Sequence, residues 1–256
     1  MEKAHSEQIL DQFTRQAVPF STAAEIRNED ALMRIVGMAQ AGPNDTVLDV
    51  ACGPGLLACM FARVVRHVTG IDVTPGMLDR ARELQRSQGL QNVAWREGDV
   101  QSLPWEDGSF SIVSSRFAFH HFPDPLRILK EMRRVCRPGG RIVIADTAPE
   151  VSKADAFNRM ERLRDPSHIR ALSPEEFLKL FAAAQLPAPA MKRDLLAYEL
   201  ESFLARSFPE EGNAERIRGL FAESLESDSL GVGAFRDRET IRFSFPTMIF
   251  ASAVPD

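Results

Sequence analysis

The stretch VLDVACGPGLLACMFA, residues 47–62, carries the strongest indication of the fold. It starts as an apolar strand that carries the acid Asp49, turns on Gly53 and Gly55, and continues as an apolar helix. A glycine turn between a strand and a helix is typical of cofactor-binding α/β proteins, because glycine lets the backbone approach a ligand closely. The stretch therefore predicts a ligand site at the end of the first strand.

Strand-like and helix-like segments alternate through the middle of the chain. Short apolar runs predict strands at 46–50, 67–72, 93–99, 110–116 and 140–146. Amphipathic patterns predict helices at 55–65, 75–88 and 124–136, with a weaker helical pattern near 101–105. Such alternation predicts a Rossmann-like, doubly wound α/β fold with a mostly parallel sheet and helices on both faces.

The two ends of the chain have other patterns. Residues 5–40 look like an amphipathic helical cover, and after residue 150 the patterns predict helices at 155–164, 173–186, 200–206 and 213–226, and strands at 191–200 and 240–254. A capping box of Ser173 and Glu176 starts one of these helices, and Pro246 implies an edge position or a bulge. We expect one domain over 1–256, with a helical cover (1–40), a ligand-binding core (41–150) and a substrate-side segment (151–256).

Composition narrows the classes of protein. The 256 residues carry a formal net charge of −5, so no basic face for nucleic acid is expected. No apolar run approaches the roughly 20 residues that span a bilayer, and the acidic N-terminus does not resemble a signal peptide. Three cysteines without CxxC spacing give no disulfide framework or zinc site. We expect a cytoplasmic protein.

Three acids lie at predicted strand ends, namely Asp49, Asp72 and Asp99. Carboxyl ends of parallel strands share one edge of a sheet, so the three should lie near one ligand. GPGLLA (53–58) with Asp72 19 residues after Gly53 allows either an NAD-type dinucleotide or S-adenosylmethionine (SAM). At about 4 Å and an effective dielectric constant of about 20, a carboxylate gains about 4 kcal/mol beside a cation and loses as much beside a phosphate. Asp49 therefore favours the cationic SAM.

Each acid has a specific expected partner. Asp72 can accept hydrogen bonds from ribose hydroxyls, and Asp99 from the adenine amine while the Val100 backbone N–H meets a ring nitrogen. The simpler alternative is that each acid caps the helix or turn that follows it.

Four stretches together resemble the class I SAM-dependent methyltransferases, in the type 11 branch that includes ubiquinone/menaquinone C-methyltransferases. They are VLDVACGPG, VTGIDVTPGMLDRAR, EGDVQSLPWEDGSFSIVSSRFAFHHFPDP and EMRRVCRPGGRIVIAD, which cover 46–146 almost without gaps. The resemblance implies a seven-stranded sheet with an antiparallel last strand. It also implies the cofactor S-adenosyl-L-methionine, with S-adenosylhomocysteine (SAH) as product.

The expected cofactor contacts follow from the matching positions. They are Asp49, Ala51, Gly53, Gly55, Asp72, Val73, Met77, Asp99, Val100 and Arg116. The sequence departs from the family pattern at two places in the turn: Ala51 replaces the usual first glycine, and Pro54 separates the other two.

Candidate catalytic residues lie after the fourth predicted strand and in a later loop. His120 and His121 stand where an acceptor should approach, and an imidazole could remove its proton; His168 is a further candidate. The alternative is that these histidines cap a helix or pack under a loop. We expect no metal site, because neighbouring residues such as His120 and His121 rarely face one ion.

The loop RLRDPSHIRA (162–171) supplies the expected acceptor contacts Arg162 and His168, and Phe119 could form a wall of the acceptor pocket. A solvated, ion-paired loop and core packing are the alternatives. We expect a SAM-dependent methyltransferase acting on a small organic molecule, slightly favouring carbon or oxygen as acceptor atom, and we allow for a homodimer. A non-catalytic SAM-binding or partner-binding protein and an NAD(P)-dependent oxidoreductase remain open alternatives.

Overall fold

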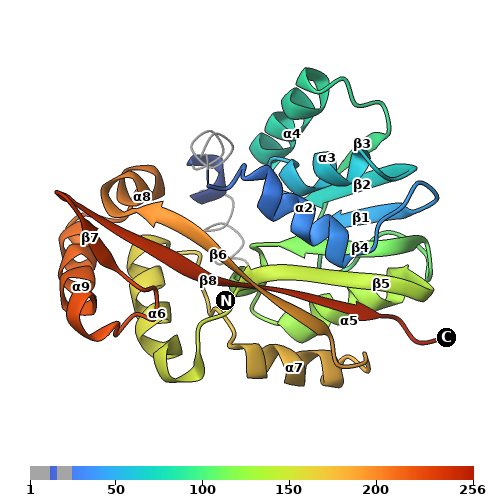
Figure 1. Cartoon of the computed structure of the whole chain (residues 1–256). Coiled ribbons are helices and arrows are strands. Elements are labelled where there is room, and N and C mark those ends of the chain that lie inside the picture. Colours follow the sequence, from blue (N-terminus) through green and yellow to red (C-terminus); the bar gives the residue numbers. More distant parts are fainter. Residues whose placement is uncertain (1–11, 16–24) are drawn as a thin grey trace.

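The computed structural model describes residues 12–15 and 25–256. Within them, one sheet has the strand order β3-β2-β1-β4-β5-β8-β6, and a short strand β7 pairs with β8 (Figure 1). The strands are β1 (Thr46–Val50), β2 (His67–Asp72), β3 (Val93–Glu97), β4 (Phe110–Arg116), β5 (Cys136–Thr147), β6 (Ala190–Glu199), β7 (Phe235–Asp237) and β8 (Thr240–Ala253). β1 to β5 pair in parallel, and β8 runs antiparallel to β5 and β6. The predicted fold class is confirmed; the three-residue β7 adds to the seven strands expected.

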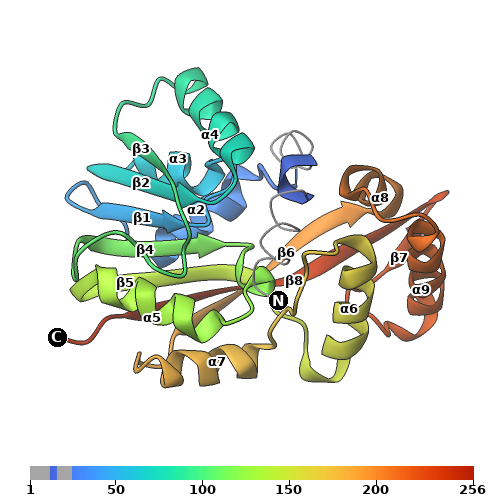
Figure 2. The same ribbon diagram turned by 180° about the vertical axis from the view of Figure 1, so that it is seen from behind.

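Helices cover both faces of the sheet. α2 (Glu29–Met38), α3 (Leu56–Ala62) and α4 (Pro75–Ser87) lie on one face, and α5 (Pro125–Val135) and α7 (Pro174–Ala183) on the other (Figures 1 and 2). Side chains alternate along each strand, so Val47 and Val143 pack toward α2 and α3 while Leu48 and Ile144 pack toward α5 and α7. Two hydrophobic cores therefore hold the strand ends in place.

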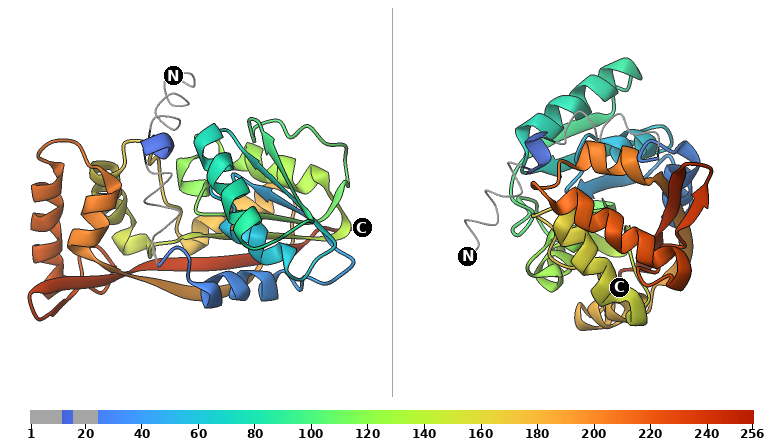
Figure 3. Two further views of the ribbon diagram at one scale, coloured as in Figure 1. Left: turned by 90° about the horizontal axis from the view of Figure 1, so that it is seen from above. Right: turned by 90° about the vertical axis from the view of Figure 1, so that its left-hand side faces the viewer.

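A second group of helices lies beyond the end of this α/β part. α6 (Val151–Arg164), α8 (Leu200–Ser207) and α9 (Asn213–Ser227) pack there against the extended ends of β6 and β8 (Figure 3). Buried aromatic rings of Phe203, Phe221 and Phe243 join these elements. The late segment thus forms a cover beside the carboxyl ends of the parallel strands. None of the helices in the described part of the chain is long and apolar enough to cross a membrane.

Some local expectations need correction. The weaker helical pattern near 101–105 is wrong: these residues form turns, because Glu131 and Asp99 side chains accept the N–H groups of Leu103 and Gln101. The predicted N-terminal helical cover lies partly outside the described residues, and within them 12–15 and α2 are helical. The predicted capping box opens α7 as expected.

Pro246 is not on an edge strand, because β8 lies between β5 and β6. It pairs with Leu195 on the β6 side, while β5 stops pairing at Thr147 opposite Thr247. The Pro246 carbonyl accepts the Ala148 N–H at 2.6 Å on the side where β5 has ended. The missing proline N–H therefore removes no bond of the β5 ladder.

Candidate functional site

A cavity, the first of two that adjoin, opens at the carboxyl ends of β1, β2 and β4. It encloses about 1320 Å³, including the part open to solvent. Its lining contains nine of the ten residues expected to contact the cofactor: Asp49, Ala51, Gly53, Asp72, Val73, Met77, Asp99, Val100 and Arg116. Residues from four separate loops therefore meet at one place, as strand-end positions in a parallel sheet require.

The glycine turn has the backbone shape that the sequence predicts. Ala51, Gly53 and Gly55 all have positive φ, at 53°, 51° and 77°. The Gly53 N–H donates to Asp72 Oδ2 at 2.8 Å, which ties the turn to the end of β2. A Cβ on Gly53 would meet no atom within 4 Å, so its bare backbone borders open space on the cavity wall.

Gly55 has a different role from the one expected. It does not line the first cavity, and a Cβ there would lie 2.5 Å from the Trp95 ring and 2.9 Å from Ala81 Cβ. Gly55 is also the N-cap of α3. The absence of a side chain thus lets α3 pack closely on the neighbouring elements, and the expected cofactor contact is corrected to a packing position.

Asp49 is a buried carboxyl group that faces the first cavity. Its side chain is 1% exposed, and Oδ1 accepts from the Ser114 hydroxyl at 2.8 Å. Burial raises the pKa of Asp49 to about 7, against the lowering effects of Ser114 and Arg116. A cationic ligand group would favour the ionised form. The buried carboxyl group of Asp49 therefore suits the ammonium of SAM, which needs a negatively charged acceptor.

The other two acids combine structural and ligand-facing positions. Asp72 Oδ1 accepts the Thr74 N–H at 2.9 Å at the start of α4, and burial raises the Asp72 pKa. Asp99 accepts the Gln101 N–H at 2.8 Å and remains exposed. Both carboxylates can accept further hydrogen bonds, because each oxygen has two lone pairs. Capping a turn and facing a ligand are therefore compatible here.

A second cavity adjoins the first on the side of α6 and α8. It encloses about 690 Å³, including its opening to solvent, and shares the residues Phe13, Phe117 and His121 with the first. Its other lining residues are Ile26, His120, Thr147, Glu161, Arg164, Asp165, Tyr198, Phe203, Arg206, Ser207 and Phe245. Two neighbouring cavities that share a wall suit two ligands that must react with each other.

His120 lines the second cavity and is hydrogen-bonded to Asp146. His120 Nδ1 donates to Asp146 Oδ1 at 2.5 Å, and Asp146 also accepts the Phe119 N–H at 2.8 Å. Burial alone would lower the pKa of His120, but the charge and hydrogen bond of Asp146 outweigh burial and raise it. Burial would raise the pKa of Asp146, and His120 lowers it below its usual range. With Nδ1 held by the carboxylate, Nε2 is the ring atom that can take a proton.

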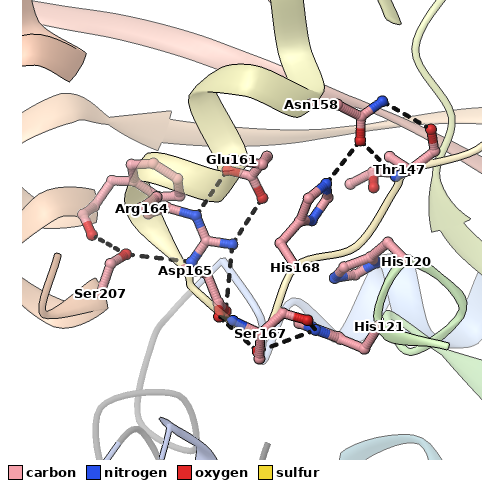
Figure 4. Close-up of polar contacts among 12 residues, drawn as sticks. His120, His121, Thr147, Asn158, Glu161, Arg164, Asp165, Ser167, His168 and Ser207 are labelled. Atoms are coloured by element: carbon pink, nitrogen blue, oxygen red, sulfur yellow. Dashed lines mark hydrogen bonds and ion pairs between the residues drawn. The ribbon is translucent and has the colours of Figure 1, made fainter. Parts of the chain in front are cut away.

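His121 lies at the wall between the cavities and is held by a backbone carbonyl, whereas His120 is held by a carboxylate. Its Nδ1 donates to the Ser167 carbonyl at 3.0 Å, and Ser167 Oγ donates to Asp165 at 2.6 Å. Arg164 continues this chain of contacts to Glu161 on α6, with two bonds of 2.7 Å (Figure 4). Burial, and then the neighbouring His120, lower the pKa of His121 to about 4. His121 is therefore neutral and a weak base.

His168 lines neither cavity, so the expected acceptor contact and catalytic role are not supported. It is 3% exposed and its Nε2 donates to Asn158 Oδ1 at 2.7 Å (Figure 4). Burial and the neighbouring His120 hold its pKa well below the usual range. His168 is a neutral packing residue that orders the loop after α6. In the described part of the chain, no three His, Cys, Asp or Glu side chains could hold one metal ion.

Phe119 and Arg162 also lie away from both cavities. Phe119 is 1% exposed and packs against Phe122 and Phe177 in the core. Arg162 is exposed and contacts the Ile169 carbonyl at 3.4 Å. Two residues along a helix point to nearly opposite sides, so Arg164 faces the second cavity and Arg162 faces solvent.

Sequence reasoning missed two residues of the second cavity and its surroundings. Asp146 ends the run GRIVIAD, which is the fifth predicted parallel strand. The strand-end position that made Asp49, Asp72 and Asp99 candidates also applies to Asp146. Arg206 on α8 had no such indication, because only the tertiary fold brings α8 beside His120.

Comparisons with known proteins agree with this geometry. Residues 48–144 match the family model described as a methyltransferase domain. The uncharacterized methyltransferase YcgJ of Bacillus subtilis is 33% identical over 197 residues, which cover 73% of this chain and 78% of the relative. The demethylmenaquinone methyltransferase of Listeria welshimeri is 34% identical over 152 residues, covering 57% of this chain and 63% of the relative.

Solved structures extend the likeness to most of the chain. The crystal structure of YcgJ aligns with a TM-score of 0.79 at 25% identity, over 89% of this chain and 99% of that one. A Bacillus halodurans crystal structure aligns with a TM-score of 0.80 at 26% identity, over 89% and 100% of the two chains. By its fold, its cavity of strand-end acids and these relatives, the chain belongs to the class I SAM-dependent methyltransferases.

Proposed function

We propose that the chain transfers a methyl group from SAM in the first cavity to a small organic acceptor in the second, and that His120 removes the acceptor's proton. The observation that carries this proposal is the hydrogen bond between His120 and Asp146 at the second cavity, which shares Phe13, Phe117 and His121 with the first. An imidazole held by an orienting carboxylate is an arrangement suited to proton removal.

Different residues of the first cavity bind different parts of the cofactor. Asp49 holds the ammonium, Asp72 accepts from the ribose hydroxyls, and Asp99 accepts from the adenine amine. The bare Gly53 backbone makes room for the methionine part. Arg116 stays protonated at neutral pH although burial lowers its pKa to about 10, so it can meet the carboxylate of the ligand.

When bound, SAM would supply a methyl group attached to a positively charged sulfur, and loss of this methyl group leaves SAH, whose sulfur is neutral. Since the methyl group is already activated, the main task of the chain is to align the acceptor. His120 holds the proton that the acceptor loses, and Asp146 orients the imidazole and stabilises its charged form. Proton removal by His120 suits a hydroxyl oxygen and a carbon with an acidic C–H equally as the acceptor atom. An acceptor without a removable proton would not use His120.

The three candidate histidines differ in their positions, their partners and the direction of their pKa shifts. His120 has the raised pKa and the second-cavity position, His121 is neutral and held by Ser167, and His168 is held by Asn158. A base that binds a proton strongly and faces the acceptor is suited to this role. Of the three, only His120 has a raised pKa and lines the second cavity.

The test is transfer of label from methyl-labelled SAM to a panel of small phenols, enols and carboxylates. His120→Gln should lower kcat at least about 100-fold on any accepted molecule while SAH affinity stays unchanged. His67→Gln is the matched control, since His67 at the start of β2 lines neither cavity. Full turnover of His120→Gln would remove it from the mechanism, and absence of SAH binding to the wild type would contradict the proposal as a whole.

A further inference from the structure

Arg206 in the second cavity has hydrogen-bonding capacity that no described residue uses. Its Nη2 is buried without a hydrogen-bond partner among the described residues, and Nη1 reaches Glu25 only at 3.4 Å. Buried N–H groups are nearly always satisfied, so an unpaired one on a residue that lines a cavity points to a ligand atom as its partner. A guanidinium is the side chain best suited to a planar anion such as a carboxylate.

The other charged groups of the second cavity already have partners. Glu161 binds Arg164 through two hydrogen bonds of 2.7 Å, and Asp165 accepts from Ser167 at 2.6 and 2.9 Å (Figure 4). An incoming anion would therefore find neither acid unpaired. Arg206 is the cation of this cavity with donors to spare, within the part of the chain that the structure describes.

Aromatic rings form much of the remaining wall. Tyr198, Phe203 and Phe245 pack edge-on or tilted against one another, with ring centroids 5.1 to 5.4 Å apart. The Arg206 guanidinium lies over the Tyr198 ring, 5.1 Å from its centroid. Flat aromatic walls favour a flat ring as ligand, and the stacked guanidinium is held in one orientation.

We propose that the second cavity binds a phenol that carries a carboxylate, with the carboxylate on Arg206 and the hydroxyl toward His120. This assignment rests on the proposed function and adds the chemical class of the acceptor. The aromatic rings hold the ring of the acceptor, Arg206 fixes one end of it, and the His120–Asp146 pair meets the proton that must leave.

The test measures binding, so it needs no knowledge of the natural acceptor. Calorimetry on the SAH-saturated protein compares 3- and 4-hydroxybenzoate with their methyl esters and with benzoate, which lacks the hydroxyl. At least one hydroxybenzoate should bind at least tenfold more tightly than its own ester and than benzoate. Arg206→Gln should bind the hydroxybenzoate at least tenfold more weakly than the wild type does and should bind the ester with unchanged affinity. The affinity of Arg206→Lys for the hydroxybenzoate should lie between those of the wild type and Arg206→Gln.

Arg218→Gln is the matched control, since Arg218 on α9 is half-buried, pairs with Glu201 and lines neither cavity. Unchanged SAH affinity in each variant shows that the fold and the first cavity are intact. If the wild type binds SAH but neither hydroxybenzoate binds better than its ester, the acceptor class is wrong and the proposed function stands. The acceptor class is also wrong if Arg206→Gln keeps the preference for the carboxylate. Loss of SAH binding in the wild type would instead contradict the proposed function.

Discussion

The buried Asp49 makes a quantitative prediction about how pH affects cofactor binding. Its pKa is raised to about 7 because the carboxyl group is 1% exposed. If Asp49 must be ionised to hold the ammonium of SAH, binding releases a proton whenever the free protein holds one there. The ligand then lowers the Asp49 pKa, and affinity should increase as pH rises through 7.

The magnitude follows from the pKa. The dissociation constant should scale as one plus ten to the power of the pKa minus pH, so it should be about tenfold larger at pH 6 than at pH 8. That ratio corresponds to about 1.4 kcal/mol of binding free energy. At pH 6 about 0.9 proton should be released for each SAH bound. The α-amino group of SAH stays protonated over this range, so it does not account for the change.

Titration calorimetry at pH 6, 7 and 8 gives the affinities, and two buffers with different ionisation enthalpies give the proton count. Asp49→Asn keeps the shape and a partner for Ser114 but cannot ionise. It should bind SAH more weakly at pH 8 and show little dependence on pH. Equal wild-type affinities at pH 6 and pH 8, or the same pH dependence in Asp49→Asn, would refute the assignment of this carboxylate to the ammonium.

Three further predictions concern the backbone of the turn and the buried histidine. Ala51→Gly should stabilise the protein by about 1 kcal/mol in denaturant unfolding, because Ala51 adopts a φ of 53° that glycine tolerates better; a loss of stability would contradict this. Gly55→Ala should instead destabilise it by roughly 2 kcal/mol or more, since the new Cβ would meet Trp95 at 2.5 Å; a neutral effect would show that the ring moves freely. The lowered pKa of His168 stabilises the fold above pH 6.5, and this stabilisation is lost as pH falls. The free energy of unfolding should therefore fall by about 2 kcal/mol less between pH 7 and pH 5 in His168→Gln than in the wild type. An unchanged pH dependence would mean that His168 is protonated in the fold.

Much of the α/β part was predictable because its signals are local. The segments 46–50, 67–72 and 110–116 are strands with the predicted bounds, since apolar runs ending at turns need no distant partner to be recognised. The capping box placed the start of α7 correctly for the same reason. Family membership excludes the NAD(P)-dependent oxidoreductase interpretation. That residues 1–256 form one domain stays a prediction.

The acceptor side could not be predicted in the same way, because long-range contacts decide it. His120, His121 and His168 are equivalent as residue types, and only their partners Asp146, Ser167 and Asn158 distinguish them. The last of these partners lies ten residues from its histidine and the others 26 and 46, at positions that no periodicity connects.

Ligand-facing roles were expected for Gly55 from its place in the family's glycine turn and for Arg162 from its place in the charged loop 162–171. Neither inference can tell which side of a turn or helix faces the cavity. In the structure Gly55 faces Trp95, and Arg162 lies on the solvent side of α6.

A crystal structure of the protein with SAH tests the central claim most directly. The ligand should lie in the first cavity, with its amino group beside Asp49, its adenine beside Asp99 and its sulfur at the wall of Phe117 and His121 that adjoins the second cavity. Density for SAH elsewhere, or with its sulfur directed away from that wall, would contradict the account.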